Sequence, residues 1–272
     1  MTEGPALRPT GVHRQAPAAR GASAPEARFR WPVPYAAAHR GASRLAPENT
    51  LAAFRAALAH GATAIELDVH LSGDGRPVVI HDDLVDRTTD GTGPVSALNG
   101  TEVKQLDAGS WWSADFKGEP VPFLDEVLAL TEGRAVLHVE LKGASGRALA
   151  GDVVRLARRL GAAERVVVMS FDLDAVLAAR DAGPEFTVLP IISEPLEDQL
   201  GFAVATGVSG LNQAVGWWDR ATVRRFHDRG LLAHGSLVND VQELDDFFSR
   251  GGDVVDSDSV DCFGAAAPKN KR

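Results

Sequence analysis

Two acidic side chains occupy alternate positions along one short apolar stretch, Ile65-Glu66-Leu67-Asp68-Val69-His70. Apolar and polar residues alternate there, a pattern that predicts a β-strand with Glu66 and Asp68 on the same face. Two carboxylates on one face repel each other and are costly to bury unless a positive charge lies between them. A divalent cation or a catalytic pair of carboxyl groups would remove that cost.

Polar residues also stand at or just after the ends of other predicted strands: His39, Arg40, His81, Glu140, Lys142, Ser170, Asn239 and Asp258. Any one of them alone is more typical of a salt bridge, a structural histidine or a solvated surface. In a barrel of parallel strands the chemistry lies at the carboxyl ends, so their shared placement favours one common site. We expect His70 and His138 to be structural, and the sequence shows no partner for His13, His60, His227 and His234.

The carboxylates indicate the kind of metal that the site would hold. The acidic residues with the clearest positions at the ends of predicted strands are Glu66, Asp68 and Glu140. No cysteine or group of histidines accompanies them. Hard cations such as Mg²⁺ and Ca²⁺ prefer oxygen ligands, whereas softer metals are more often bound by cysteine and histidine. These residue types therefore predict a Mg²⁺ or Ca²⁺ site.

The basic residues and the two flanking histidines indicate the reaction. Arg40 and Lys142 suit an anionic oxygen, and the planar guanidinium of arginine matches a phosphate group. His39 and His81 can act as general base and general acid near neutral pH. Together with a metal ion that polarises the phosphoryl group, this set predicts cleavage of a phosphodiester bond.

The order of the predicted elements indicates the scaffold. Strands are expected at 34–38, 65–70, 77–80, 135–141, 165–169, 186–192, 208–211, 231–233 and 254–255, alternating with helices from residue 124 onward. About eight strand–helix units favour a closed (β/α)8 TIM barrel over residues 31–264, above an open doubly wound sheet. Residues 83–122 show no long helical period. A loop of that length is uncommon, so we predict a small subdomain inserted after the second strand.

Composition limits the partners and the location. The chain has 272 residues, of which 44% are hydrophobic, and its net charge at pH 7 is −9. This charge argues against nucleic acid as a partner, and the absence of an apolar run of about 18 residues argues against stable membrane insertion. A single cysteine and no hydrophobic signal core predict a cytoplasmic location. Residues 1–30 are predicted to be a disordered extension, and residues 265–272 a flexible tail.

Taken in order along the chain, the motifs around these residues resemble those of the glycerophosphodiester phosphodiesterase family. They are His39-Arg40-Gly41, Pro47-Glu48-Asn49-Thr50, Glu66-Leu67-Asp68-Val69, His81-Asp82, Asp86-Arg87-Thr88-Thr89, Asp107-Ala108-Gly109-Ser110, Glu140-Leu141-Lys142 and Ser170-Phe171. The resemblance covers most of residues 35–258 and implies a (β/α)8 barrel with a small subdomain inserted after the second strand.

Carried over by position, the resemblance also implies the reaction and the role of each residue. The roles are general acid or base for His39 and His81, phosphate binding for Arg40 and Lys142, and metal binding for Glu66, Asp68 and Glu140. The implied substrate is a small glycerophosphodiester, which is cleaved to sn-glycerol 3-phosphate and an alcohol. Either water or a neighbouring substrate hydroxyl, which would give a cyclic phosphate, could attack the phosphorus.

The sequence departs from the family pattern late in the chain. Ser236 stands where the family commonly has the Trp of Trp-Thr-Val-Asn, and Ser257-Asp258-Ser259-Val260 stands for Thr-Asp-x-Pro. A tryptophan there would line the alcohol side of the pocket, so its replacement bears on the choice of headgroup. The other tryptophans that could fill this space are Trp111, Trp112, Trp217 and Trp218.

Two other functions are compatible with the same residues. A phospholipase D-like enzyme acting on lysophospholipid or sphingomyelin headgroups would need an exposed apolar surface on residues 83–122. A barrel that binds a phosphate ligand without catalysis would not need the full set of acid, base and metal positions.

Overall fold

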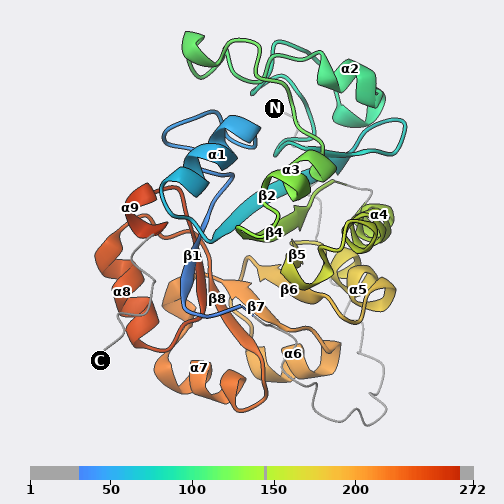
Figure 1. Cartoon of the computed structure of the whole chain (residues 1–272). Helices are drawn as coiled ribbons and strands as arrows, with labels where there is room; N and C mark the ends of the chain where they lie inside the picture. The colour runs from blue at the N-terminus through green and yellow to red at the C-terminus, as the bar shows by residue number, and fades with distance from the viewer. Residues whose placement is uncertain (1–30, 144–145, 264–272) are drawn as a thin grey trace, which may run out of the picture.

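Eight parallel strands close into a barrel in the computed structural model, which describes residues 31–143 and 146–263. They are β1 (Tyr35–Ala38), β2 (Ala64–Leu71), β4 (Val136–Leu141), β5 (Val166–Ser170), β6 (Thr187–Ile192), β7 (Gly210–Gln213), β8 (Leu232–Gly235) and β9 (Val254–Ser257). The barrel closes because β1 pairs with both β9 and β2 (Figure 1). The predicted (β/α)8 barrel is confirmed. The predictions for residues 1–30 and 265–272 lie outside the described residues.

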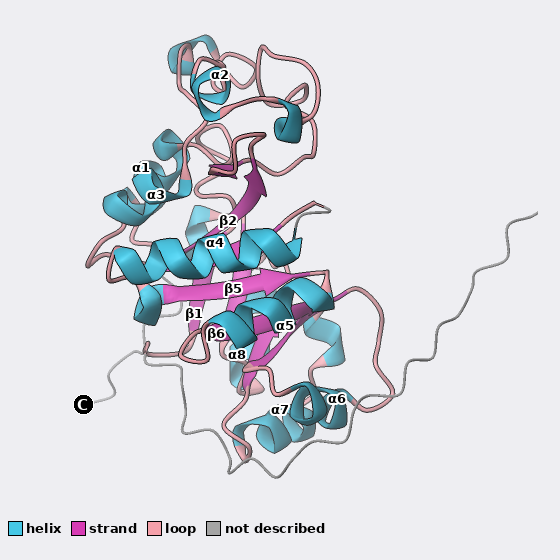
Figure 2. Ribbon diagram, turned by 90° about the vertical axis from the view of Figure 1, so that its right-hand side faces the viewer, coloured by secondary structure: helices cyan, strands magenta, loops and turns pink. Residues whose placement is uncertain are grey.

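Helices alternate with these strands around the outside of the barrel. They are α1 (Leu51–Ala59), α3 (Leu124–Leu130), α4 (Gly146–Arg159), α5 (Leu173–Ala182), α6 (Gln199–Thr206), α7 (Arg220–His227), α8 (Val241–Ser249) and α9 (Val260–Phe263). Figure 2 shows α4 and α5 lying along the outside of the sheet at β5. None of the helices within the two described ranges is long and apolar enough to cross a membrane.

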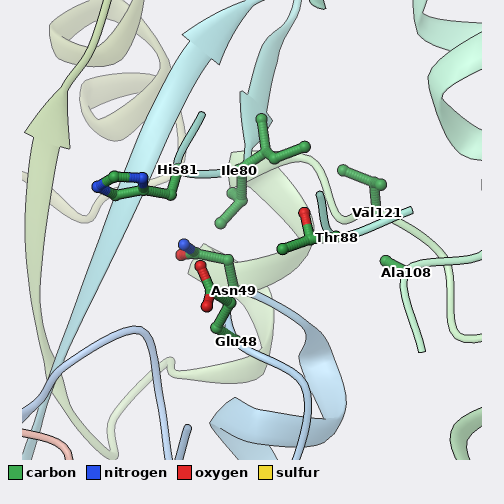
Figure 3. Close-up of a pocket in the computed structure, with 8 residues that line it drawn as sticks. Glu48, Asn49, Ile80, His81, Thr88, Ala108 and Val121 are labelled. Carbon is green, nitrogen blue, oxygen red and sulfur yellow. The ribbon is translucent and has the colours of Figure 1, made fainter. Parts of the chain in front are cut away.

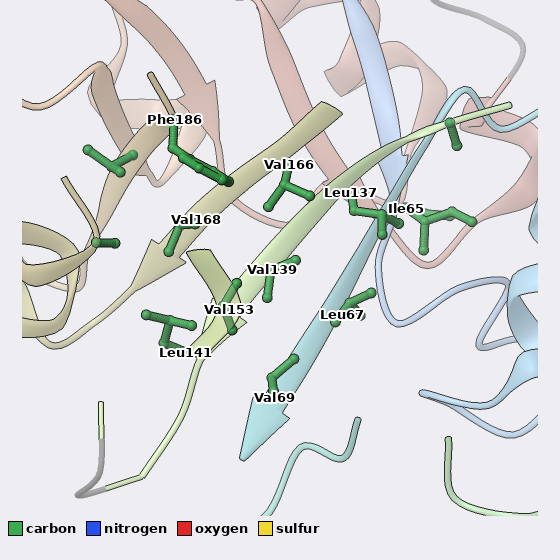
Figure 4. Close-up of a cluster of buried hydrophobic side chains, with 14 of the residues drawn as sticks. Ile65, Leu67, Val69, Leu137, Val139, Leu141, Val153, Val166, Val168 and Phe186 are labelled. Carbon is green, nitrogen blue, oxygen red and sulfur yellow. The ribbon is translucent and has the colours of Figure 1, made fainter. Parts of the chain in front are cut away.

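Alternation along each strand separates an outer apolar layer from the barrel interior. Ile65, Leu67 and Val69 of β2 are fully buried among apolar residues of the surrounding helices, and Figure 4 shows them beside the corresponding residues of β4 and β5. Burying a side chain of this size contributes about 1.5–3 kcal/mol. The intervening residues, Glu66 and Asp68, therefore point into the barrel.

Some strand boundaries differ from those predicted. The strand predicted at 208–211 is β7 (Gly210–Gln213), because pairing with β8 extends it through Asn212 and Gln213, which are weak strand formers by propensity. The helix that follows β6 begins at Gln199, because Asp198 caps it by accepting a hydrogen bond from the backbone of Gly201.

Residues 77–123 form the part of the chain that departs from the barrel repeat. After a turn at residues 73–75, β3 (Pro77–Val79) pairs antiparallel with β2. The short helices η1 (Val95–Ala97), α2 (Gly100–Lys104) and η2 (Ala114–Phe116) follow. These residues share an apolar cluster of their own: Val78, Ile80, Val85, Val95, Val103, Ala108, Val121 and Phe123. Figure 1 shows the segment beyond the end of β2, and we interpret residues 83–122 as the inserted subdomain.

Candidate active site

Three carboxylates from two neighbouring strands meet inside the barrel. Glu66 and Asp68 lie on β2, and Glu140 lies on β4 opposite Asp68 in the strand pairing. One oxygen of each side chain lies within 4.8 Å of the chosen oxygens of the other two, and all three residues are buried. The structure thus brings together the three residues that the sequence marked as metal ligands.

Burial and repulsion disturb the protonation of these carboxyl groups. Burial, followed by the charge of Asp68, raises the pKa of Glu140 to about 7 and raises the pKa of Glu66 well above its usual value. Burial also acts to raise the pKa of Asp68, but the positive charges of Lys142 and Arg40 outweigh it and lower that pKa. The neighbouring cations therefore hold one carboxylate ionised and leave the other two short of positive charge.

Two buried carboxylate oxygens at this position have Lys142 as their neighbouring positive charge. Among the residues that the structure describes, Oδ1 of Asp68 and Oε1 of Glu140 are buried without a well-formed hydrogen bond. The ammonium of Lys142 lies 3.2 Å from the first and 2.6 Å from the second. The donor set of three carboxylates fits an oxygen-preferring cation such as Mg²⁺ or Ca²⁺, which would share these oxygens with Lys142.

The loop between β1 and α1 holds the two carboxylates of β2. The backbone N–H of Arg40 donates to Oε2 of Glu66 at 2.9 Å, and Nε of Arg40 lies 3.4 Å from Oδ2 of Asp68. Nδ2 of Asn49 donates to Oδ2 of Asp68 at 2.8 Å. The next residue, Thr50, caps α1.

Both loop residues have unusual backbone angles. Arg40 and Asn49 have φ values of 56° and 57°, and no other non-glycine residue in the described ranges has a positive φ. This conformation is unfavourable by about 1–2 kcal/mol for a residue with a Cβ atom. Strain of this kind persists where surrounding contacts over-determine the conformation, and it concentrates at functional sites.

His39 is oriented by a carboxylate that directly follows the last strand, β9. Its Nδ1 lies 2.7 Å from Oδ1 of Asp258, and its Nε2 lies 3.9 Å from Oε2 of Glu66. Asn239 fixes Asp258, since its amide donates to Oδ2 at 2.9 Å and accepts from the backbone of Asp258 at 2.8 Å. Burial alone would lower the pKa of His39, but the charge of Glu66 and the bond to Asp258 raise it to about 9.

His81 has a matching carboxylate partner. Its Nδ1 lies 2.6 Å from Oδ1 of Asp82, which accepts two hydrogen bonds from Arg87, to Oδ2 at 2.6 Å and to Oδ1 at 3.0 Å. Arg87 also donates twice to Glu48, which in turn accepts from Arg40 at 2.9 Å. A continuous chain of charged groups thus connects His81 to the arginine beside the carboxylates.

A pocket borders this second histidine. Its lining is Glu48, Asn49, Val79, Ile80, His81, Thr88, Ala108 and Val121, which come from the loop after β1 and from the inserted segment. Figure 3 shows His81 across the pocket from Ala108 and Val121. The inserted segment therefore forms one wall beside the site.

Comparison with known proteins identifies the family. The model of the glycerophosphoryl diester phosphodiesterase family matches residues 39–262. The chain belongs to this family of phosphoric diester hydrolases.

Individual relatives agree with the family assignment. A glycerophosphodiester phosphodiesterase of Caldanaerobacter subterraneus is 40% identical over 156 residues, which are 56% of this chain and 63% of that enzyme. The chain thus spans less than two thirds of that relative. The structure of a glycerophosphodiester phosphodiesterase of Agrobacterium tumefaciens is similar, with 32% identity, a TM-score of 0.74 and coverage of 85% of this chain and 99% of that one. The structure of a phosphodiesterase of Oleispira antarctica in complex with the product sn-glycerol-3-phosphate is also similar, with 30% identity and a TM-score of 0.76. The match covers 86% of this chain and 96% of that one.

Ser170 is the one strand-end residue named from the sequence that does not join the site, and three other histidines make contacts of their own. Oγ of Ser170 donates to the carbonyl of Leu141 at 2.7 Å and accepts from the backbone of Asp172, so it links β5 to β4. His70 lies 3.0 Å from the carbonyl oxygen of His81 and supports its backbone. Two histidines without a partner in the sequence have one in the fold, since His227 lies 3.0 Å from Asp253 and His234 lies 3.0 Å from Asp256.

The position of the missing tryptophan holds a small polar residue. Oγ of Ser236 donates to Oδ1 of Asn212 at 2.9 Å. Trp218 does not fill the space, because it is fully buried, donates to the carbonyl of His234 and packs against Phe226 of α7. Trp111 and Trp112 lie on the inserted segment and are 40% and 37% exposed.

Proposed function

We propose that the protein is a metal-dependent phosphodiesterase that cleaves glycerophosphodiesters to sn-glycerol 3-phosphate and an alcohol. The observation that carries the proposal is the buried cluster of Glu66, Asp68 and Glu140, whose ligand oxygens lie within 4.8 Å of one another. Membership of the family supports it, and the related Oleispira enzyme binds the product that we propose.

Five residues would bind the metal and the phosphate. Glu66, Asp68 and Glu140 would hold Mg²⁺ or Ca²⁺, which when bound supplies Lewis-acid polarisation of a phosphoryl oxygen. Arg40 and Lys142 flank these carboxylates, with contacts of 3.4 and 3.2 Å to Asp68. Their positive charges are placed to receive the substrate phosphate and to stabilise charge that develops on it.

The two histidines would move protons. Each has its Nδ1 beside a carboxylate, His39 beside Asp258 at 2.7 Å and His81 beside Asp82 at 2.6 Å. A carboxylate at Nδ1 fixes the tautomer, leaves Nε2 for proton transfer and stabilises the imidazolium form. One histidine accepts the proton of the attacking oxygen, and the other donates a proton to the leaving alcohol.

One observation favours a second substrate class, lysophospholipids. Large apolar side chains are exposed on segments that follow strands at the carboxyl end of the barrel and on the insertion: Leu84, Trp111, Trp112, Phe171 and Leu237. Exposed apolar groups near a site are suited to contact an acyl chain. The same carboxylates, arginine and lysine would bind the phosphate of a lysophospholipid.

A substrate panel with product analysis tests both candidates. Purified protein supplied with Mg²⁺ or Ca²⁺ should release glycerol 3-phosphate and choline from glycerophosphocholine. If lysophosphatidylcholine is cleaved instead, the double variant Trp111→Ser, Trp112→Ser should reduce only that activity. The absence of cleavage across glycerophosphodiesters and lysophospholipids, in protein shown to be folded and metal-loaded, would refute catalysis and favour the phosphate-binding barrel. The cytoplasmic location remains a prediction.

A further inference from the structure

A second group of buried polar side chains lies inside the barrel. His138 of β4, His234 of β8 and Asp256 of β9 each offer one ligand atom within 4.8 Å of those of the other two. Both histidines are fully buried, and Asp256 is 6% exposed. His138 precedes Glu140 by two residues on the same strand, so it lies one inward-facing position deeper than the carboxylate site.

Each of these three side chains has a buried atom whose hydrogen-bonding capacity is unused. Within the described ranges, Nδ1 of His138, Nδ1 of His234 and Oδ1 of Asp256 have no hydrogen-bond partner. Burying one such atom without a partner destabilises a protein by about 1–3 kcal/mol. The same three side chains form the cluster, in which Nε2 of His234 lies 3.0 Å from Oδ2 of Asp256. Their unused nitrogen and oxygen atoms are suited to a bound species that accepts electron pairs.

The surrounding residues hold the cluster in place. The hydroxyl of Tyr35 lies 2.9 Å from Nε2 of His138, and Nδ2 of Asn212 donates to Oδ2 of Asp256 at 3.2 Å. When Nε2–H of His138 donates to the tyrosine oxygen, Nδ1 carries the free lone pair. Histidines that bind metals are commonly oriented by such a bond from the other ring nitrogen.

We propose that His138, His234 and Asp256 form a second metal site, selective for a transition metal of the Zn²⁺ type. Two imidazoles and one carboxylate favour Zn²⁺, Co²⁺ or Fe²⁺, whereas Mg²⁺ and Ca²⁺ favour all-oxygen sites such as the one above it. His138 lies on β4, whereas His234 and Asp256 lie on β8 and β9. In the sheet order, β5, β6 and β7 lie between β4 and β8. A bound cation therefore links opposite sides of the barrel.

The inner site also lies within electrostatic reach of the carboxylate site. The charge of Asp256 contributes to raising the pKa of Glu66 and that of His39, although burial and nearer charges act more strongly on both. A cation bound to Asp256 would neutralise this charge. The metal content of the inner site can be measured without any assay of hydrolysis, so the inference stands or falls separately from the proposed function.

Metal retention in the full chain tests the proposal. Chelator-stripped protein is loaded with Zn²⁺ in excess Mg²⁺, passed through a desalting column and analysed for metal. We expect one Zn²⁺ per chain in the wild type and in Glu66→Gln, and loss of that ion in His234→Asn and Asp256→Asn. Tyr35→Phe should weaken Zn²⁺ binding by about 10- to 100-fold. His60→Asn, which changes an exposed histidine, is the matched control and should retain the metal.

A spectroscopic measurement on the wild type covers the case in which these variants do not fold. X-ray absorption of the Zn²⁺-loaded protein should show imidazole ligands, and Zn²⁺ should raise the unfolding temperature. The proposal is overturned if the wild type retains no Zn²⁺, in which case water fills the cluster. It is also overturned if excess Mg²⁺ displaces the ion, if the absorption spectrum shows oxygen ligands alone, or if folded His234→Asn and Asp256→Asn retain as much Zn²⁺ as the control.

Discussion

The side-chain amide of Asn49 makes two hydrogen bonds with Asp68. Its Nδ2 donates to Oδ2 of Asp68 at 2.8 Å, and its Oδ1 accepts from the backbone N–H of Asp68 at 3.2 Å. Asn49 itself has a φ of 57°. A loop residue in an unfavourable backbone conformation thus fixes one of the proposed metal ligands.

Replacement of Asn49 should weaken the metal site. Hydrogen bonds to a charged group are worth about 1.5–3 kcal/mol, so Asn49→Ala and Asn49→Gly should each lower metal affinity and kcat/KM by roughly 10- to 100-fold. Comparing the two variants separates the effect of the lost hydrogen bonds to Asp68 from the effect of backbone strain at residue 49, because glycine tolerates a positive φ. Thermal unfolding should therefore show Asn49→Gly more stable than Asn49→Ala by about 1 kcal/mol. Equal metal affinity in wild type and both variants would contradict this role.

Removal of the carboxylate beside His81 should slow catalysis without weakening the metal. In Asp82→Asn, Nδ1 of His81 loses the charged partner that orients the ring, so we predict a fall in kcat of about 100-fold. Metal affinity should stay within a factor of two or so of the wild type, since Asp82 is not among the carboxylates of the cluster. Asp115→Asn, an exposed change on the same inserted segment, is the control. Steady-state kinetics with calorimetric metal titration check both parts.

The pH dependence of the metal-free protein should report on His39. Its pKa is raised from 6.5 to about 9, because the charge of Glu66 and the bond to Asp258 outweigh burial. A raised histidine pKa stabilises the folded state fully below pH 6.5, and this contribution is lost as the pH rises through about 9. Asp258→Asn should therefore flatten the fall in stability over this interval and lower the pKa measured by NMR. An unchanged His39 titration in Asp258→Asn would rule out this pairing.

Glu140 should destabilise the protein when the metal is removed. Burial and the charge of Asp68 raise its pKa to about 7, above the usual 4.5, so its contribution to stability falls as the pH rises through this interval. At pH 8 in a chelator, Glu140→Gln should be more stable than the wild type by about 1–3 kcal/mol. The difference should shrink at low pH and reverse when Mg²⁺ or Ca²⁺ is added. Denaturant unfolding measures all three conditions.

The barrel and most of the site could be predicted from the sequence because both depend on local patterns. Period-2 alternation predicted β2 with Glu66 and Asp68 on the same face, and the fold makes this the inner face. The Ala-rich strand β1 was harder to predict from propensity, and it forms because it pairs with neighbours on both sides. Strand order then brings Glu140 beside Asp68.

The contacts that orient these residues could not be predicted, because they depend on the tertiary path of loops. Asn49 and Thr50 are adjacent in one motif, and only the fold shows that Thr50 caps α1 while Asn49 contacts Asp68. The links from Asp82 through Arg87 to Glu48 join segments that no spacing rule connects. Strand register, which the sequence does not show, determines the partners of His234.

Metal-dependent turnover of a glycerophosphodiester is the most direct measurement of the proposed metal centre. A single preparation is stripped with EDTA, assayed on glycerophosphocholine, reloaded with Mg²⁺ or Ca²⁺ and assayed again, with Glu66→Gln treated in parallel. The structure predicts no glycerol 3-phosphate from the stripped protein, release of glycerol 3-phosphate after reloading, and no recovery in the variant. Turnover that survives both the chelator and the loss of Glu66 would contradict a metal centre formed by Glu66, Asp68 and Glu140.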